Sequence, residues 1–397
     1  MNIAAYEPVS RGYTAGNRLQ LLRNGEAYFP ALIEAIDRAR HEVHLETYIF
    51  ADDATGREVA AALSRAAQRG VMVRLLVDGF GARDFDTGLG AGLGADGVEV
   101  MVYRPEAGRY AFRRHRLRRM HRKLAVIDGE VGFAGGLNII DDFDTSTSPR
   151  FDYAVRIEGP LVARLHLAVR HVWRLVRWAR LGRRPPAPVP LPRLQQTAAP
   201  DGMQAALLVR DNLAHRHDIE YAYLDAIRGA RREIFIANAY FLPGRRFSKF
   251  LLLAAGRGVR VTLLLQGRSD HLLLHYATQS LYDRMLAAGV RVFEYDRAEL
   301  HAKVAVVDDE WATVGSSNID PFSLLLAREA NIVVRDAGFA GELRASLATI
   351  LAGAAREVRA EELLLLPWYG RLVRATAYSL VRFMLGVTRY AGKQYSD

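Results

Sequence analysis

The chain has 397 residues, half of them hydrophobic and a quarter charged, so it is long enough for two domains with their own cores and too well mixed to be disordered. It contains no cysteine, which excludes disulfides and thiolate metal sites. The formal net charge of +10 favours an anionic partner, which could be nucleic acid, lipid headgroups or a phosphorylated substrate.

The N-terminal segment, residues 1–17, lacks the basic flank, apolar core and small-residue cleavage site of a signal peptide. Farther along, no run of about 18 uncharged apolar residues predicts a membrane-spanning helix. Residues 35–100 instead alternate helical segments with apolar runs of four to eight residues. This alternation is typical of βαβ units, whose sheet is covered by helices on both faces.

The same blocks return in the second half of the chain, in the same order. The matching pairs are Ala35–Val43 with Ala226–Ile234, Ala66–Val71 with Ala254–Val259, and Gly97–Val100 with Gly289–Val292. Chance similarity in an Ala-, Arg- and Leu-rich chain does not explain several separate blocks that agree in order. The sequence therefore predicts two halves of similar structure.

A strongly basic stretch follows in the first half. Arg109–Lys123 contains eight lysine and arginine residues and has no counterpart in the second half. It could draw an anionic lipid to a nearby site, at about 1 kcal/mol per cation close to an anionic surface. The same charges would suit nucleic acid, and a solvated basic loop is the third interpretation.

Proline then separates the two halves. Five of the eight residues from Pro185 to Pro192 are proline, which is incompatible with a helix or a central strand. We expect a first domain at 1–182, a linker at 183–200 and a second domain at 201–360. A helical tail at 361–397 completes the prediction.

One motif occurs in both halves with identical spacing. Its residues are His121, Lys123, Asp128, Gly135 and Asn138 in the first half, and His301, Lys303, Asp308, Gly315 and Asn318 in the second. The chain has only four lysines against fifty arginines, and two of the four belong to this motif. A compact ammonium group that meets a phosphate oxygen in a tight site would explain this choice.

The motif predicts phosphodiester chemistry. Residues 123–127 and 303–307 read as strands, so each histidine and its lysine point to the same face. One neutral histidine would attack phosphorus, and the other, protonated, would protonate the leaving alkoxide. Lysines and amides would stabilise the charge on the phosphoryl oxygens. No metal or other cofactor is expected.

Each histidine also needs a partner that orients its second ring nitrogen. Asp152 and Glu329 are the candidates, because both precede a predicted strand at equivalent places in the repeat. The alternative for each is a solvated acid at the end of a strand.

The C-terminal tail has a helical pattern with two faces. Basic residues gather on one face and apolar residues on the other, namely Arg371, Arg374, Arg382, Arg389 and Lys393 opposite Leu372, Val373, Thr376, Leu380, Phe383, Met384 and Val387. An amphipathic helix at a membrane surface has this pattern. A helix packed on the protein's own core is the alternative.

The duplicated motif resembles that of the phospholipase D superfamily, and the flanking segments resemble bacterial cardiolipin synthases of the shorter, B-type branch. Those segments are Glu46–Phe50, Gly135–Asn138, Ile157–Pro160 and Ser316–Ser323. The resemblance implies two tandem α/β domains, each an α-β-α sandwich, with pseudo-two-fold symmetry and one active site between them. Gly136 departs from the serine of many relatives, and Ala327 from a frequent asparagine.

The resemblance also implies roles for the site residues. The histidine nucleophile would be His121, and His301 would be the acid and base. Asp128 and Asp308 count with the catalytic motif, Asp152 and Glu329 are suggested as orienting carboxylates, and Asn138, Asn318 and Ser316 would bind the substrate phosphate.

The expected function is therefore cardiolipin synthesis, with phosphatidylglycerol as donor and acceptor of the phosphatidyl group. Hydrolysis by a phospholipase D or a nuclease of the same superfamily is the first alternative, and a non-catalytic anionic-lipid-binding protein is the second. We expect anionic phospholipids as partners, no nucleic acid, and a peripheral position on the cytoplasmic face of the bacterial inner membrane.

Overall fold

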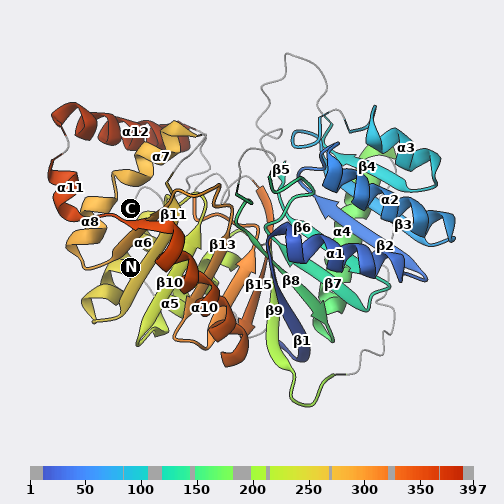
Figure 1. Cartoon of the computed structure of the whole chain (residues 1–397), viewed down its shortest axis with the longest axis horizontal. Helices are drawn as coiled ribbons and strands as arrows, with labels where there is room; N and C mark the ends of the chain where they lie inside the picture. Colours follow the sequence, from blue (N-terminus) through green and yellow to red (C-terminus); the bar gives the residue numbers. More distant parts are fainter. Residues whose placement is uncertain are drawn as a thin grey trace.

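The strands of both halves form one continuous sheet in the computed structural model of the chain (Figure 1). The structure describes residues 12–83, 85–105, 119–143, 148–181, 198–211, 215–267, 271–320, 327–365 and 367–387. The Pro-rich segment and most of the basic stretch lie outside these ranges. The predicted domain boundaries therefore stay a prediction.

The first half runs from strand β1 to helix α4. Its elements are β1 (Thr14–Arg23), α1 (Asn24–Asp37), β2 (Glu42–Thr47), α2 (Ala54–Gln68), β3 (Met72–Asp78), α3 (Leu89–Ala95), β4 (Glu99–Tyr103), β5 (Arg119–Met120), β6 (Lys123–Ile127), β7 (Val131–Gly135), β8 (Tyr153–Glu158) and α4 (Leu161–Leu181).

The second half repeats this order and adds elements at its end. They are β9 (Met203–Arg210), α5 (Asp218–Gly229), β10 (Glu233–Asn238), α6 (Arg245–Gly256), β11 (Arg260–Gln266), α7 (Leu272–Gln279), α8 (Tyr282–Ala287), β12 (Arg291–Tyr295), β13 (Lys303–Val307), β14 (Trp311–Gly315), β15 (Ala327–Arg335), α10 (Ala337–Ala354), β16 (Ala355–Glu357), α11 (Ala360–Leu364) and α12 (Trp368–Val387).

The sheet reads the same outward from its centre in both directions. From β1 the order is β8, β7, β6, β2, β3, β4, and from β9 it is β15, β14, β13, β10, β11, β12. The antiparallel pair of β1 and β9 joins the halves, and Figure 1 shows both strands at the junction. The predicted duplication and the α/β fold class are confirmed.

Matching residues in the repeat perform matching structural tasks. Gly70 and Gly258 end α2 and α6 with φ angles of +86° and +84°, which explains the Arg-Gly-Val block that recurs in the sequence. Each glycine leads into the next strand, β3 or β11, whose apolar residues are buried. The repeat in sequence is therefore a repeat in backbone conformation.

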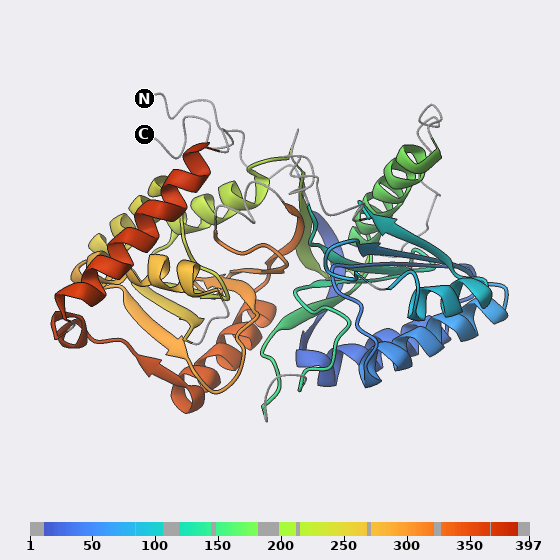
Figure 2. The ribbon, with the colours of Figure 1, turned by 90° about the horizontal axis from the view of Figure 1, so that it is seen from above.

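Helices cover both faces of the sheet in each half (Figure 2). Helices α1 to α3 pack on one face of the first half, and α5, α6 and α8 cover the corresponding face of the second. Helices α4 and α10 cover the other faces, and each also crosses the junction, because α4 contacts β9 and α10 contacts β1. This exchange of helices fixes the two halves relative to each other.

The tail forms helix α12, which packs on α7 through a narrow stripe. Ala377 and Val381 are buried against Leu242 and Ala277. The predicted apolar face stays largely exposed, including Leu372, Val373, Leu380, Phe383 and Met384. Core packing and an exposed apolar face therefore occur together in this helix. Among the described residues, no helix is both long and apolar enough to cross a membrane.

Candidate active site

The two predicted motifs start at equivalent strands. His121 follows β5 and lies two residues before Lys123, where β6 begins, and His301 lies two residues before Lys303, where β13 begins. Each lysine folds back so that its Nζ donates a hydrogen bond to the carbonyl oxygen of its own motif histidine, over 2.8 Å for Lys123. Each lysine ammonium is thus held beside the backbone of its own motif histidine.

The orienting carboxylates are exchanged between the halves. Nδ1 of His121 lies 3.1 Å from Oε1 of Glu329, and Nδ1 of His301 lies 2.6 Å from Oδ2 of Asp152. A carboxylate at Nδ1 leaves Nε2 of each ring free to react. Each half therefore supplies the histidine of one pair and the carboxylate of the other, which brings both motifs to one site.

Backbone contacts reinforce this exchange. The N–H of His121 donates to the carbonyl of Arg328, and that of His301 donates to the carbonyl of Phe151, at 2.9 and 2.8 Å. Strand β5, just before His121, pairs in parallel with β15 of the second half. Both histidines are thus attached to strands that belong to the opposite half.

A polar side chain at the end of the third strand of each half holds the residue before the histidine. Asp78 accepts a hydrogen bond from the N–H of Met120 at 2.8 Å, and Gln266 accepts one from Leu300 at 2.5 Å. Asp78 and Gln266 occupy equivalent places in the repeat, so this support is duplicated as well. It fixes the approach of the chain to each imidazole.

The charged groups of the site are buried but the imidazoles stay accessible. Lys123, Lys303, Asp152 and Glu329 are at most 3% exposed, whereas the side chains of His121 and His301 keep 18% and 13%. Burial lowers the pKa of Lys123 to about 7 and that of Lys303 to about 8. Burial also raises the pKa of Asp152 to about 7.

Burial shifts the histidines too, and the nearby lysines add to the shift. Desolvation is the main cause that lowers the pKa of both rings, and it lowers that of His301 well below its usual value. Charge from Lys303 acts on His121, and charge from Lys123 acts on His301. The four basic groups thus behave as one electrostatic unit.

The charges suggest what this unit binds. The positive charges of the two ammonium groups cancel the negative charges of the two carboxylates. A bound phosphodiester adds one negative charge, which is balanced when one imidazole takes up a proton. One protonated and one neutral imidazole is the state that nucleophilic attack with proton donation requires.

Asp128 and Asp308 do not lie at this site. Each follows its five-residue strand and adopts a positive φ, 50° and 55°. The carboxylate of Asp128 accepts hydrogen bonds from three consecutive backbone N–H groups at residues 40–42, each at 2.8 Å, and Asp308 does the same at residues 231–233. At about 3.3 Å per residue, Asp128 stands on the order of 16 Å along the chain from Lys123. The geometry assigns both a fold-anchoring role in place of the expected catalytic one.

Ser316 also differs from its expected phosphate-binding role. Its hydroxyl is buried and donates to Oε2 of Glu329 at 2.5 Å, so it positions the carboxylate behind His121. At the equivalent Gly136, an added Cβ would lie 2.4 Å from both carboxylate oxygens of Asp152. Glycine at position 136 therefore leaves room for the Asp152 carboxylate. This space, and not a lost contact to phosphate, explains why Gly136 replaces the serine of many relatives.

Asn138 and Asn318 lie close to the motif strands. Oδ1 of Asn138 accepts from the N–H of Ile49 at 3.2 Å, and Oδ1 of Asn318 accepts from that of Tyr240 at 3.4 Å. Within the described residues neither Nδ2 donates a hydrogen bond. Both amides thus keep the donors that the phosphate-binding prediction needs.

Two neighbours of the motif, Tyr48 and Arg122, had no role predicted from the sequence. The ring of Tyr48 lies 4.9 Å from that of His121 and 5.4 Å from Nζ of Lys123. Arg122, between the histidine and the lysine, forms a buried pair with Glu46, with contacts of 2.5 and 2.8 Å. Both Glu46 and Tyr48 fall in the segment that supported the family resemblance, so the signal was present in the sequence.

A family model described as "Cardiolipin synthase, PLD-like domain" matches residues 32–173 and 223–351. The two segments together cover most of the chain and include both motifs. The chain belongs to this family. The two matched segments correspond to the two structural halves, and this agrees with the symmetry of the sheet.

Curated relatives match along nearly the full chain. Cardiolipin synthase B of Escherichia coli (strain K12) is 41% identical over 379 residues, which cover 92% of this chain and 88% of the relative. Cardiolipin synthase B of Salmonella typhi is 39% identical over 381 residues, covering 94% and 89%. Cardiolipin synthase A of Pseudomonas putida (strain KT2440) is 33% identical over 352 residues, covering 88% and 71%.

Solved structures agree on the fold. A phosphatidylserine synthase of Haemophilus influenzae superposes with a TM-score of 0.71 over 94% of this chain and 97% of its own, at 14% identity. A polyphosphate kinase of Porphyromonas gingivalis gives 0.57 over 93% and 53%, at 18% identity. At such identities the likeness concerns the fold alone.

Proposed function

We propose that this chain is a cardiolipin synthase that transfers a phosphatidyl group between two phosphatidylglycerol molecules through a covalent phosphohistidine. The observation that carries the proposal is the exchanged pairing of two imidazoles with two carboxylates, which engages each ring at Nδ1 and, within the described residues, leaves Nε2 available. The family and the relatives agree with a phosphatidyltransferase.

In the first step, neutral Nε2 of His121 attacks the phosphorus of the first phosphatidylglycerol. The P–O bond to the headgroup glycerol breaks, and that oxygen takes a proton from Nε2 of His301, so free glycerol leaves. Glu329 stabilises the positive charge that develops on His121. The assignment of His121 as nucleophile follows the family resemblance.

In the second step, His301 is the base. It takes the proton from a terminal hydroxyl of the second phosphatidylglycerol, whose oxygen attacks phosphorus. The N–P bond to His121 breaks, and cardiolipin forms. Lys123 and Lys303 would stabilise the phosphoryl oxygens in both steps, and buried charges have strong effects because water does not screen them.

Separation of the lipid products tests the proposal. Purified chain is incubated with phosphatidylglycerol vesicles, and cardiolipin and free glycerol should form in equal amounts. Phosphatidic acid in place of cardiolipin would show that water resolves the intermediate, as in a phospholipase D. An unchanged lipid would favour a binding protein.

The anionic lipid bilayer is the proposed partner, and the α12 surface is the proposed contact. This surface consists of exposed apolar side chains on α12 and the adjacent α7, including Trp368 at 76%, Phe383 at 68% and Leu272 at 63% exposed. Figure 1 shows α12 and α7 on the same upper side of the molecule as β5, which lies near the middle and precedes His121. Aromatic and apolar groups of this kind insert at the acyl boundary.

A paired substitution tests this contact. Trp368→Ser with Phe383→Ser should weaken co-sedimentation with phosphatidylglycerol vesicles, while hydrolysis of a soluble diester stays unchanged. Leu253→Ser is the matched control, since Leu253 is 52% exposed on α6. Equal sedimentation of all three proteins would rule out the α12 surface as the contact.

We place the enzyme peripherally on the cytoplasmic face of the bacterial inner membrane. The net charge of +10 favours the anionic lipids of that leaflet. Fractionation of cells should find the chain in the membrane pellet and release part of it at high salt.

A further inference from the structure

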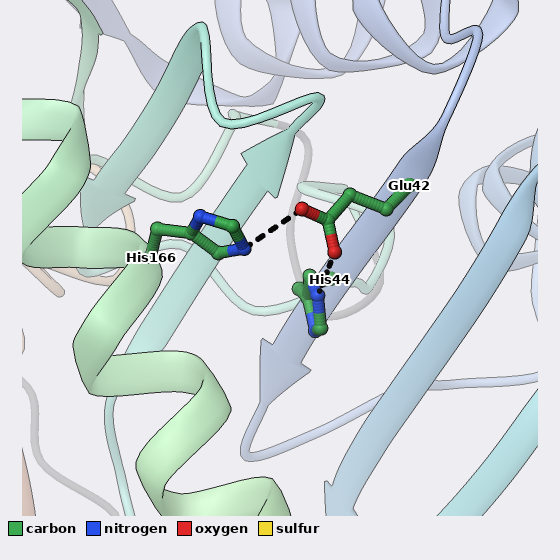
Figure 3. Close-up of side chains that lie close together, drawn as sticks. All are labelled: Glu42, His44 and His166. Atoms are coloured by element: carbon green, nitrogen blue, oxygen red, sulfur yellow. Dashed lines mark hydrogen bonds and ion pairs between the residues drawn. The ribbon is translucent and has the colours of Figure 1, made fainter. Parts of the chain in front are cut away.

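A second group of titratable side chains lies between strand β2 and helix α4, apart from the motif histidines. Glu42 and His44 come from β2 and His166 comes from α4 (Figure 3). Nε2 of His44 lies 2.9 Å from Oε2 of Glu42, and Nε2 of His166 lies 2.9 Å from Oε1. One carboxylate thus stands between two imidazoles.

The two histidines of this group are almost completely buried, which is uncommon for titratable side chains. His44 and His166 are 2% and 1% exposed, and the Glu42 side chain keeps 17%. Buried polar groups nearly always form hydrogen bonds. Yet within the described residues neither ring nitrogen of His166 meets the geometry of a hydrogen bond, although Nε2 lies 2.9 Å from Oε1 of Glu42.

A ligand between the three side chains would satisfy this orphaned imidazole. We propose that Glu42, His44 and His166 bind a divalent transition-metal ion, for which Zn²⁺ is the best fit, and that the ion fastens α4 to β2. The three ligand atoms all lie within 4.8 Å of one another. Two atoms that bind one ion at about 2.0–2.2 Å lie at most about 4.4 Å apart, so a small adjustment of the side chains would close all three on an ion.

The residue types select the class of ion. Two imidazole nitrogens and one carboxylate oxygen suit Zn²⁺, Co²⁺ or Ni²⁺ better than Mg²⁺ or Ca²⁺, which prefer oxygen ligands alone. A water molecule or the second carboxylate oxygen would complete a tetrahedral set. The partly exposed Glu42 gives the ion a route from solvent.

The protonation states agree with this assignment. Metal ligation needs neutral imidazoles, and burial lowers the pKa of His44. Although burial opposes it, the interactions with His166 and His44 hold the pKa of the Glu42 carboxyl below its usual value. Both shifts favour the metal-binding forms of His44 and Glu42.

Two neighbours limit the affinity. Nδ1 of His166 has no acceptor in the described structure, although such a partner typically improves metal affinity about 10–100-fold. Positive charge on Arg74 acts on His44 and would also repel the ion. We therefore expect micromolar binding rather than the tighter binding of a fully supported zinc site.

The helix that this ion would hold also supports the first motif. Arg122, between His121 and Lys123, donates a hydrogen bond from its guanidinium to the carbonyl of Ala168 at 2.9 Å, two residues after His166. A bound ion should thus stiffen α4 and raise thermal stability. Since no ligand is shared with the motif, the ion should not take part in the chemistry.

Metal titration of the full-length protein tests the site. After treatment with a chelator, the protein is titrated with Co²⁺, whose visible absorption reports four- or five-coordinate binding, and with Zn²⁺ during thermal unfolding. Zn²⁺ at 100-fold excess over its dissociation constant should raise Tm by about 3–8 °C. His166→Gln should lose one equivalent of Co²⁺ and this rise in Tm.

His171→Gln is the matched control, since His171 lies on the same helix outside the group. It should keep both signals. Equal Co²⁺ stoichiometry and equal Tm shifts in the two variants would overturn the site. If His166→Gln fails to fold, Glu42→Gln replaces the more exposed ligand. Anomalous scattering from zinc-soaked crystals of the unmodified protein then decides, and no peak between the three side chains contradicts the proposal.

Discussion

The two half-sites hold their imidazoles in the same way and build the support from different residues. Behind His301 stand Asp152 and a glycine, Gly136, whereas behind His121 stand the longer Glu329 and a serine, Ser316. Asp152 fills the space that a side chain at position 136 would need. Between the two halves, the length of the carboxylate side chain and the residue beside it therefore differ together.

A second pair of positions has changed in the same concerted way. The first half buries the ion pair of Glu46 and Arg122, while the equivalent positions of the second half carry two alanines, Ala237 and Ala302. Either solution avoids an unpaired buried charge, which is the costly alternative. The duplicated halves thus differ through compensating pairs of residues and keep the geometry of the imidazoles.

The largest expected effect separates the two histidines. His121→Ala should reduce cardiolipin synthesis about 10⁶-fold, and His301→Ala about 10²–10⁴-fold, because the first loses the nucleophile and the second loses the acid of the first step and the base of the second. With a p-nitrophenyl diester, whose leaving group needs no proton, His301→Ala should still accumulate a phosphoenzyme. Quenched-flow kinetics and an assay for acid-labile, base-stable enzyme-bound phosphate measure both.

His121→Ala is the control for that experiment, since it should form no phosphoenzyme with either substrate. A phosphoenzyme in His121→Ala, but not in His301→Ala, would exchange the two roles.

The buried ion pair offers the next largest effect, on stability. Arg122→Ala leaves Glu46 buried without a partner and should reduce the free energy of unfolding by about 3–5 kcal/mol. The double variant Glu46→Ala with Arg122→Ala imitates the second half and should lose less. Urea unfolding compares them.

An exposed ion pair is the control. Arg57 lies 2.7 Å from Asp52, and both side chains are more than half exposed. Arg57→Ala should change the free energy of unfolding by less than about 1 kcal/mol. A double variant as unstable as Arg122→Ala would mean that packing, and not the unpaired charge, sets the cost.

Alanine at the two equivalent positions behind the carboxylates should affect activity by different mechanisms. Gly136→Ala places a Cβ against Asp152 and should displace it, which lowers kcat about 100-fold. Ser316→Ala removes one hydrogen bond to Glu329 and should lower kcat about 10-fold. Steady-state kinetics measure both variants. Full activity of Gly136→Ala would contradict the displacement of Asp152 by the added Cβ.

The sequence predicted the duplication and both motifs because the motif spacing is identical in the two halves. It predicted both carboxylates because each stands beside a predicted strand at an equivalent place in the repeat. It did not predict β1 or β9, whose alternating pattern of small, polar and apolar residues hides the strands. Those two strands join the halves. The exchange of carboxylates across the junction therefore could not be read from the sequence.

The functions of Asp128 and Ser316 were out of reach for a different reason. Spacing places a residue along a strand, but the atoms that its side chain meets depend on neighbouring strands. Asp128 meets the backbone that precedes β2, and Ser316 meets Glu329 on β15. Likewise, His166 is more than 120 residues from His44 in the sequence, so only the packing of α4 on β2 brings them together.

The smallest expected effect is a difference in pH dependence between the two lysines. Burial lowers the pKa of Lys123 to about 7 and that of Lys303 to about 8, so each loses its positive charge as the pH rises through its own value. For a soluble p-nitrophenyl diester, whose leaving group needs no proton from His301, kcat/KM should therefore fall about 10-fold per pH unit above 7, and more steeply above 8. The acidic limb should lie below pH 6.5, because burial lowers the pKa of His121.

Arginine keeps its charge throughout this range, so it distinguishes the two halves. Lys123→Arg should move the alkaline limb of kcat/KM up towards 8, whereas Lys303→Arg should leave it near 7. The limb of kcat should lie at higher pH than that of kcat/KM, since a bound phosphodiester anion favours the charged lysines. If neither substitution moves the alkaline limb, a histidine sets that limb and both lysines keep their charge at every pH tested.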